Sequence, residues 1–232
     1  GLVGSEMCIR DRPGPVLIDI TKDAQFEKIN FSYKKIVGIR SYKAVPKINH
    51  NNIKLAAELI NNAKKPLIVW GQGVILGNAE NELNNFVEKS GIPAAWTILG
   101  ASAIPTSHPL NVGMLGMHGN YAPNVLTNEC DLLIAIGVRF DDRVTANPSF
   151  FAQNAKVIHA DIDPAEIGKV REAQVPIVGD AKSVLIGLIE ALKGSDLDTA
   201  SWINDLKDMK QNFPLSYDQK DDGPLKVPYV LE

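Results

Sequence analysis

The chain has 232 residues, of which 45% are hydrophobic and 22% are charged, and its formal net charge is -3. This composition is typical of a protein with a sizeable core and an ordinary polar surface. The sequence contains no run of lysine and arginine, which argues against a nucleic-acid partner. Its longest apolar stretches, such as Leu132–Ile136, are too short to cross a bilayer, so we expect no membrane span.

The first residues of the chain differ from the rest, and the cysteines indicate the compartment in which the protein works. Residues 1–11 lack the apolar core of a signal peptide and do not resemble the rest of the chain, so we interpret them as a non-native leader. That interpretation would be wrong if they packed into the core. The two cysteines, Cys8 and Cys130, form no disulfide framework and fit a reducing, cytoplasmic compartment. Cys130 precedes an apolar strand and is interpreted as a small buried residue.

Apolar runs alternate with helical patterns from Pro15 onward. Strands are predicted at residues 15–20, 66–70, 93–97, 131–136, 156–160 and 175–178. Helices are predicted around residues 53–60, 83–87, 184–192 and 202–209, the first capped by Asn51 or Asn52, and residues 214–228 are expected to form a linker. Strands that are apolar on both faces and alternate with helices indicate a parallel sheet covered on both sides. The predicted fold is therefore α/β, a doubly wound parallel sheet of Rossmann-like type.

The residues just beyond these strands are the candidates for ligand binding, because open parallel sheets bind ligands beyond the carboxyl ends of their strands. They are Gly71, Gln72, Gly73, Thr97, Gly137, Val138, Arg139, Asp161, Ile162, Asp163, Gly179 and Asp180. Glycine lets the backbone approach a ligand, helix starts attract phosphate, and aspartate accepts hydrogen bonds from ribose. Each glycine alone also fits a plain turn, and the aspartates also fit helix capping, but together they favour a dinucleotide.

A standard nicotinamide site is disfavoured. The turn after residues 66–70 has Leu76 where the third glycine of the usual fingerprint stands, and Gly77 comes one residue late. Thr97 occupies the position near the end of the next strand where such a site carries an acid.

Two further segments have unusual compositions. Residues 113–119 combine three glycines with two methionines and His118, and residues 139–145 place two arginines and two aspartates just after a strand. The second segment is either a self-paired surface cluster or a phosphate clamp whose aspartates hold its arginines in place. His118 has no neighbouring serine or cysteine nucleophile, and the four histidines lack metal-ligand spacing. We therefore assign no catalytic residue and no metal site.

These segments are similar to segments of a known enzyme family. The chain from Arg12 resembles the catalytic subunit of acetolactate synthase (acetohydroxyacid synthase), a thiamine-diphosphate enzyme. The resemblance rests on Arg-Pro-Gly-Pro-Val-Leu-Ile-Asp at 12–19, Leu-Gly-Met-His-Gly at 115–119, Gly-Val-Arg-Phe-Asp-Asp-Arg-Val-Thr at 137–145 and Val-Gly-Asp-Ala at 178–181. Asp11 and Ala146 depart from the family's usual glycines, and Gln72 is a tolerated variant.

The resemblance implies three similar α/β domains, of which this chain is the central one that binds FAD. We expect residues 12–195 to form that domain and residues 196–232 a helix and linker toward a missing domain that binds thiamine diphosphate and Mg²⁺. By resemblance, the FAD contacts fall on Arg12, Gly71, Gln72, Gly73, Thr97, Ile98, Met117, His118, Gly137, Arg139, Asp141, Arg143, Val144, Asp161, Ile162, Asp180 and Ala181. Met117, Asp142 and Arg143 would also face the substrate channel.

The implied function is that of a fragment. The family condenses two pyruvates, or pyruvate and 2-oxobutanoate, with loss of CO₂, in branched-chain amino acid biosynthesis. The partners implied are small 2-keto acids, a homodimer or tetramer, and a regulatory small subunit. The fragment itself is expected to be inactive, since the thiamine-diphosphate signature is missing. A sister thiamine enzyme (glyoxylate carboligase or pyruvate oxidase) and a stand-alone nucleotide-binding module are the alternatives.

Overall fold

The computed structural model describes residues 15, 17–33, 45–195, 197–214, 216, 223, 224 and 226. The chain divides into two compact units, residues 1–47 and residues 48–232. The larger, second unit contains the sheet.

The first unit contains one short helix, α2 (Lys22–Phe26), among its described residues. The strand predicted at 15–20 is wrong for the residues that can be examined, because residues 17–20 have no strand geometry. Leu17 is 93% exposed and Ile18 is 64% exposed. An apolar run becomes a strand only when a neighbouring strand pairs with it and buries it, and none of the described residues does so. The proposed leader, 1–11, lies outside the described residues.

The second unit is built on a six-stranded sheet whose strands are all parallel. The strands are β1 (Pro66–Trp70), β2 (Ala94–Trp96), β3 (Asn111–Met114), β4 (Leu132–Ile136), β5 (Lys156–Asp161) and β6 (Val175–Val178). Their order is β3-β2-β1-β4-β5-β6, so the winding direction reverses between β1 and β4. This is the Rossmann order, and the predicted fold class is confirmed.

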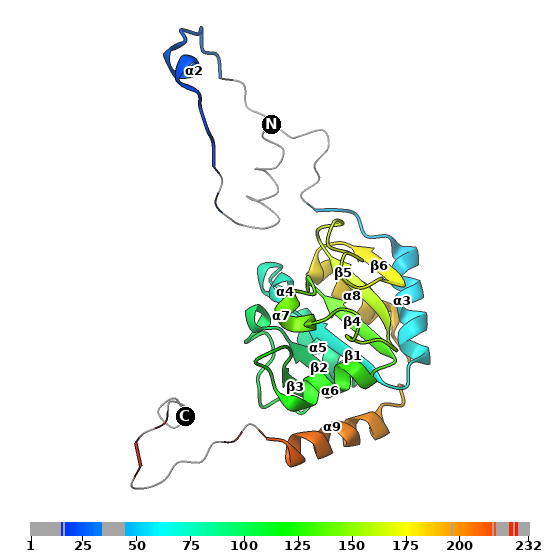
Figure 1. Ribbon diagram of the computed structural model, residues 1–232. Helices are drawn as coiled ribbons and strands as arrows, with labels where there is room; N and C mark the ends of the chain where they lie inside the picture. Colours follow the sequence, from blue (N-terminus) through cyan, green and yellow to red (C-terminus); the bar gives the residue numbers. More distant parts are fainter. Residues whose placement is uncertain are drawn as a thin grey trace. The chain divides into compact units, whose positions relative to one another are not determined.

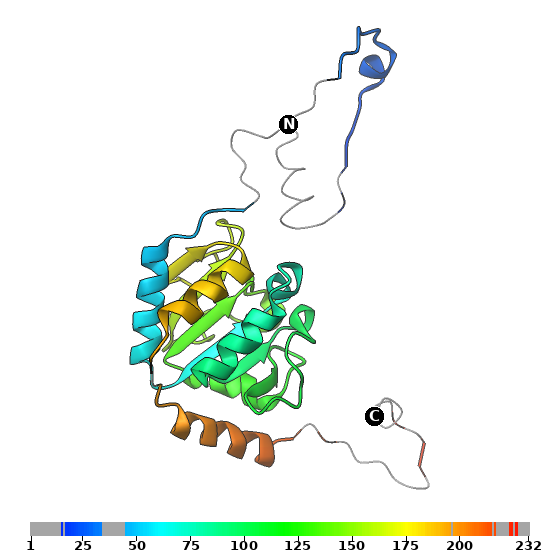
Figure 2. The ribbon, with the colours of Figure 1, turned by 180° about the vertical axis from the view of Figure 1, so that it is seen from behind.

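Helices cover both faces of this sheet (Figure 1). The helices of this unit are α3 (His50–Asn62), α4 (Gln72–Leu76), α5 (Glu80–Ser90), the 3-10 helix η1 (Ile98–Gly100), α6 (Tyr121–Glu129), α7 (Asp142–Thr145), α8 (Ala181–Ala191) and α9 (Ala200–Asn212), of which α4, η1 and α7 are short helices in the loops that follow strands. Figure 2 shows α3, α8 and α5 side by side on one face. The cap of α3 was predicted wrongly: Asn49 caps it, by accepting a hydrogen bond from the Asn51 N–H at 3.0 Å.

The sheet separates two apolar cores. On one face, Ile68, Ile134 and Ile158 pack with residues of α3, α5 and α8. On the other face, Val69, Leu133 and other strand residues pack with α6 and α9. The strands β1 and β4 are buried along their whole length, as expected for the centre of a doubly wound sheet.

Helix α9 is attached to the amino ends of the strands. The indole N–H of Trp202 donates to the carbonyl of Pro66 at 2.8 Å, and the Lys210 ammonium donates to the carbonyl of Asn111 at 3.0 Å. The Thr199 hydroxyl donates to the Gly91 carbonyl at 3.1 Å. Trp202 and Leu206 are buried in the second core. The helix predicted around 202–209 therefore packs into the same unit as the sheet.

Candidate functional site

The loops that leave the ends of the strands lie together along one edge of the sheet, which we call the carboxyl edge. It consists of residues 71–73, 97–99, 115–119, 137–145, 162–163 and 179–181. All predicted site residues except Arg12 lie here or at the end of the adjoining strand. Arg12 lies outside the described residues. Exposed side chains at this edge include Gln72, Ile98, Met117, His118, Arg139, Asp142 and Arg143.

The tips of β1 and β4 touch backbone to backbone at the point where the winding reverses. The Gly71 N–H donates to the Ile136 carbonyl at 3.1 Å, and the Gly73 N–H donates to the Gly137 carbonyl at 3.2 Å. A Cβ placed on Gly137 would lie 2.6 Å from the Gly73 Cα, and Gly137 has a φ of +61°. Only glycines permit this approach, which brings two loop backbones to the place where such folds bind ligands.

The segment 139–143 forms a tight, charged turn that leads into the first residues of α7. The Asp141 side chain caps α7 by accepting from the Arg143 N–H at 3.0 Å, and it also accepts from the Arg139 guanidinium at 3.4 Å. The Arg143 N–H chiefly lowers the pKa of Asp141, and the Asp142 side chain, Arg139 and Arg143 lower it further. Arg143 lies 3.9 Å from Asp142, and its side chain is 73% exposed. Both guanidinium groups stay open to an anion, because exposed pairs of this kind are weak.

The loop 115–119 is joined to this turn by its backbone. The Met117 N–H donates to the Arg143 carbonyl at 2.8 Å. Asn124, in α6, fixes the loop through two hydrogen bonds. Its side chain accepts from the Gly116 N–H at 3.1 Å and donates to the Gly116 carbonyl at 3.0 Å. Sequence reasoning missed Asn124, although asparagine soon after a glycine-rich loop is a signal of side-chain to backbone bonding. The two unusual segments of the sequence thus form one structural element.

The aspartates at β5 and β6 have local roles. The Asp161 carboxylate accepts from the Asp163 N–H at 2.9 Å, and Asp163 accepts from the Ala165 N–H at 2.9 Å. Asp180 caps α8, accepting from the Ser183 N–H at 3.0 Å and from its hydroxyl at 3.1 Å. The capping alternative is therefore realised at Asp180.

We expect Asp180→Ala to lower the free energy of unfolding by about 1 kcal/mol, because it removes the cap of α8. Asp180→Ser should restore most of that loss, since serine caps as well as aspartate does. Urea unfolding followed by circular dichroism measures both variants. A serine variant as unstable as the alanine variant would contradict the capping role.

The chemistry of the carboxyl edge fits a flavin dinucleotide. Arg139 and Arg143 supply the planar cations that suit a diphosphate. Ile98 is 70% exposed and Met117 is 58% exposed, so apolar surface is available for an aromatic ring system. Among the described residues, no group of three or more histidine, cysteine, aspartate or glutamate side chains could hold a metal ion.

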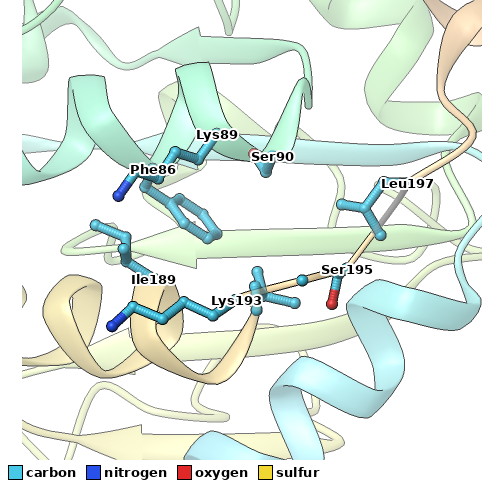
Figure 3. Close-up of a pocket in the computed structure, with 9 residues that line it drawn as sticks. Phe86, Lys89, Ser90, Ile189, Lys193, Ser195 and Leu197 are labelled. Atoms are coloured by element: carbon cyan, nitrogen blue, oxygen red, sulfur yellow. The ribbon is translucent and has the colours of Figure 1, made fainter.

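A cavity of about 250 Å³ lies at the other end of the unit (Figure 3). Phe86 and Lys89, near the end of α5, line it together with Ile189, in the last turn of α8, and with Lys193 and Leu197, which follow that helix. In a parallel α/β fold these helix ends lie at the amino ends of the strands, away from the carboxyl edge. Lys193 is paired with Glu190 at 2.6 Å. The free backbone carbonyls at the carboxyl ends of α5 and α8 carry partial negative charge, which offsets the positive charges of Lys89 and Lys193. Nothing here favours an anionic nucleotide over solvent.

Two remaining expectations concern Cys130 and membrane spans. Cys130 is fully buried, as predicted, and its thiol donates to the Thr127 carbonyl at 3.1 Å. Burial raises the pKa of Cys130 to about 12, so this thiol is inert at neutral pH. Within the part of the chain that the structure describes, no helix is long and apolar enough to cross a membrane.

The strand order and the paired glycines at the reversal point define an α/β domain of Rossmann-like architecture. The sequence model of the family "Thiamine pyrophosphate enzyme, central domain" matches residues 53–188. The chain therefore belongs to the thiamine pyrophosphate enzyme family, as its central domain.

Comparison with known proteins shows which members of this family the chain is similar to. The chain is 44% identical to the acetolactate synthase large subunit of Corynebacterium glutamicum, over 97% of the chain and 37% of that protein. It is 45% identical to that of Mycobacterium tuberculosis, over 95% of the chain and 36% of that protein. It is 41% identical to that of Buchnera aphidicola subsp. Schizaphis graminum, over 90% of the chain and 37% of that protein. The chain is thus a homologue that spans little more than a third of the length of these relatives.

Proposed function

We propose that this chain binds FAD at the carboxyl edge of its sheet, as the central domain of an acetolactate synthase. The observation that carries the proposal is the conjunction of the Gly73–Gly137 backbone contact with the exposed Arg139 and Arg143 at one end of the sheet. The glycines let the two loop backbones meet at the point where the winding reverses, which is where such folds bind ligands, and the arginines neutralise a diphosphate. The flavin holds the loops together and lines the substrate channel, where Met117, Asp142 and Arg143 would lie.

For the whole protein we propose condensation of two pyruvates, or of pyruvate and 2-oxobutanoate, with release of CO₂, in branched-chain amino acid biosynthesis in the cytoplasm. Thiamine diphosphate, held together with Mg²⁺ outside this domain, would supply the carbanion chemistry of the reaction. The proposed assembly is a homodimer or tetramer with a regulatory small subunit. The identity of 44% to a large subunit supports this assignment over glyoxylate carboligase, pyruvate oxidase or a stand-alone nucleotide-binding module.

The test of FAD binding uses the purified chain. We expect its tryptophan fluorescence to be quenched by FAD in a saturable way, with ADP competing and NAD competing more weakly. The reason is that ADP shares the diphosphate, whereas the Thr97 position lacks the acid that selects the ribose of NAD. A chain that binds neither FAD nor ADP would contradict the proposal. The chain alone should form no acetolactate from pyruvate.

A further inference from the structure

His159 is a fully buried histidine on β5 that contacts the turn carrying Arg139. Its Nε2 lies 2.8 Å from the carbonyl oxygen of Val138. Its ring meets the ring of Phe140 edge-on, with the two centroids 4.9 Å apart and an interplanar angle of 66°. One side chain therefore holds the residue before Arg139 and the residue after it.

The turn needs such support because its backbone is strained. Phe140 has a φ of +55°, which is uncommon for a bulky side chain. A residue stays in such a conformation only where the surrounding structure holds it there. Phe140 is 1% exposed, and its ring packs between His159 and Phe151, whose centroid lies 5.9 Å away.

The protonation of His159 is set by its partner. A carbonyl oxygen can only accept, so Nε2 carries the proton and donates it. The other ring nitrogen, Nδ1, is buried and has no hydrogen-bond partner among the described residues. Burial lowers the pKa of His159, and the Val138 hydrogen bond and the charges of Asp161 and Glu166 act in the opposite direction. The ring is therefore neutral at pH 7, with one defined donor.

We propose that His159 is a positioning residue for the FAD site, which fixes the backbone on both sides of Arg139 so that its guanidinium extends from the carboxyl edge. The inference deepens the proposed function and rests on it for the identity of the ligand. The positioning itself is a property of the chain without ligand, so it can be measured separately. Arg139 has a side-chain exposure of 55%, and within the described ranges its guanidinium makes one weak pair, with Asp141, so its direction depends mainly on its backbone.

The test compares His159→Gln with His159→Leu, two side chains of similar size. The amide nitrogen of glutamine can take the place of Nε2 as the donor to Val138, whereas leucine cannot donate. Without ligand, we expect hydrogen exchange of amides 138–143 to be about tenfold faster in His159→Leu and near the wild-type rate in His159→Gln, because one net hydrogen bond is lost. The FAD dissociation constant should rise by about the same factor in His159→Leu alone.

The pH profile supplies a readout that a loss of packing would not change. A turn released from the core can take up a proton on His159 more readily than the anchored turn, since burial lowers the pKa of the histidine. Protection of amides 138–143, corrected for intrinsic exchange, should therefore fall as the pH drops below about 6.5 in the wild type and stay level in His159→Gln. The charged groups acting on the ring are Asp161 and Glu166, and its contacts on the β4 side, Val138 and Phe140, are apolar.

The outcomes separate the two proposals. If His159→Leu exchanges like the wild type, or His159→Gln is as disturbed as His159→Leu, the positioning role is overturned. If His159→Leu loosens the turn but the wild-type chain binds no FAD, the positioning role stands and the proposed function fails. If His159→Leu does not fold, the pH profiles of the wild type and His159→Gln decide, and identical profiles overturn the proposal.

Discussion

Replacing Gly137 with alanine is expected to destabilise the domain by about 3 kcal/mol or more, a large part of the total stability of an ordinary domain. The added Cβ would lie 2.6 Å from the Gly73 Cα and 3.0 Å from its carbonyl carbon and nitrogen. These are backbone atoms, so no side chain can swing away to relieve the clash. The φ of +61° adds a cost of about 1 kcal/mol for any residue with a Cβ. Urea unfolding followed by circular dichroism measures the loss.

Gly168→Ala is the matched control for that experiment. Gly168 also has a positive φ, +76°, but a Cβ added there would meet nothing within 4 Å. The control should cost only about 1 kcal/mol, the conformational part of the effect. The difference between the two variants isolates the contact between the tips of β1 and β4. Equal losses in the two variants would show that this contact is not tight.

The double substitution Arg139→Ala and Arg143→Ala is expected to weaken FAD binding by about 100-fold at low salt, because each arginine loses a charge-assisted hydrogen bond to phosphate. The fold should be little changed, since both side chains are more than half exposed. Binding by the wild type should weaken with rising salt, as expected for exposed charges, and binding by the double variant should depend less on salt. Flavin fluorescence titration at two salt concentrations measures both effects.

Two controls locate the effect at the diphosphate. Riboflavin has no phosphate, so the wild type and the double variant should bind it equally. Lys193→Ala removes a cation at the far cavity, near the amino ends of the strands, and should leave FAD binding unchanged. A double variant that binds FAD as tightly as the wild type would mean that the arginines form only a surface cluster.

The central strands could be read from the sequence because their signals are local. β1 was predicted to the residue, since the run Pro-Leu-Ile-Val-Trp is apolar throughout and ends at a glycine. β3 was missed because Val112 is its only large apolar residue buried, and Gly113 has a φ of +112°. α6 was missed because it contains Pro123 and two asparagines, although proline in a first helical turn costs no hydrogen bond.

The candidate site, like the fold, could be predicted from the sequence only in part. Its position at one edge of the sheet is given by where the strands end, because all carboxyl ends of parallel strands meet there. The hydrogen bond from Met117 to Arg143 could not be foreseen, since it joins two loops distant in sequence. The contact of His159 with the arginine turn escaped prediction for the same reason: a histidine within an apolar strand gives no sign of which carbonyl it meets.

The attachment of α9 bears on the extent of the smallest piece of this protein that folds by itself. The regular alternation of strands and helices stops near Gly194, yet three side chains beyond it bond to backbone carbonyls at Gly91, Pro66 and Asn111. A chain that ended at residue 195 would lose the donors to those carbonyls. It would also expose the apolar side chains that Trp202 and Leu206 cover. We therefore expect an autonomous version of the domain to extend through Asn212.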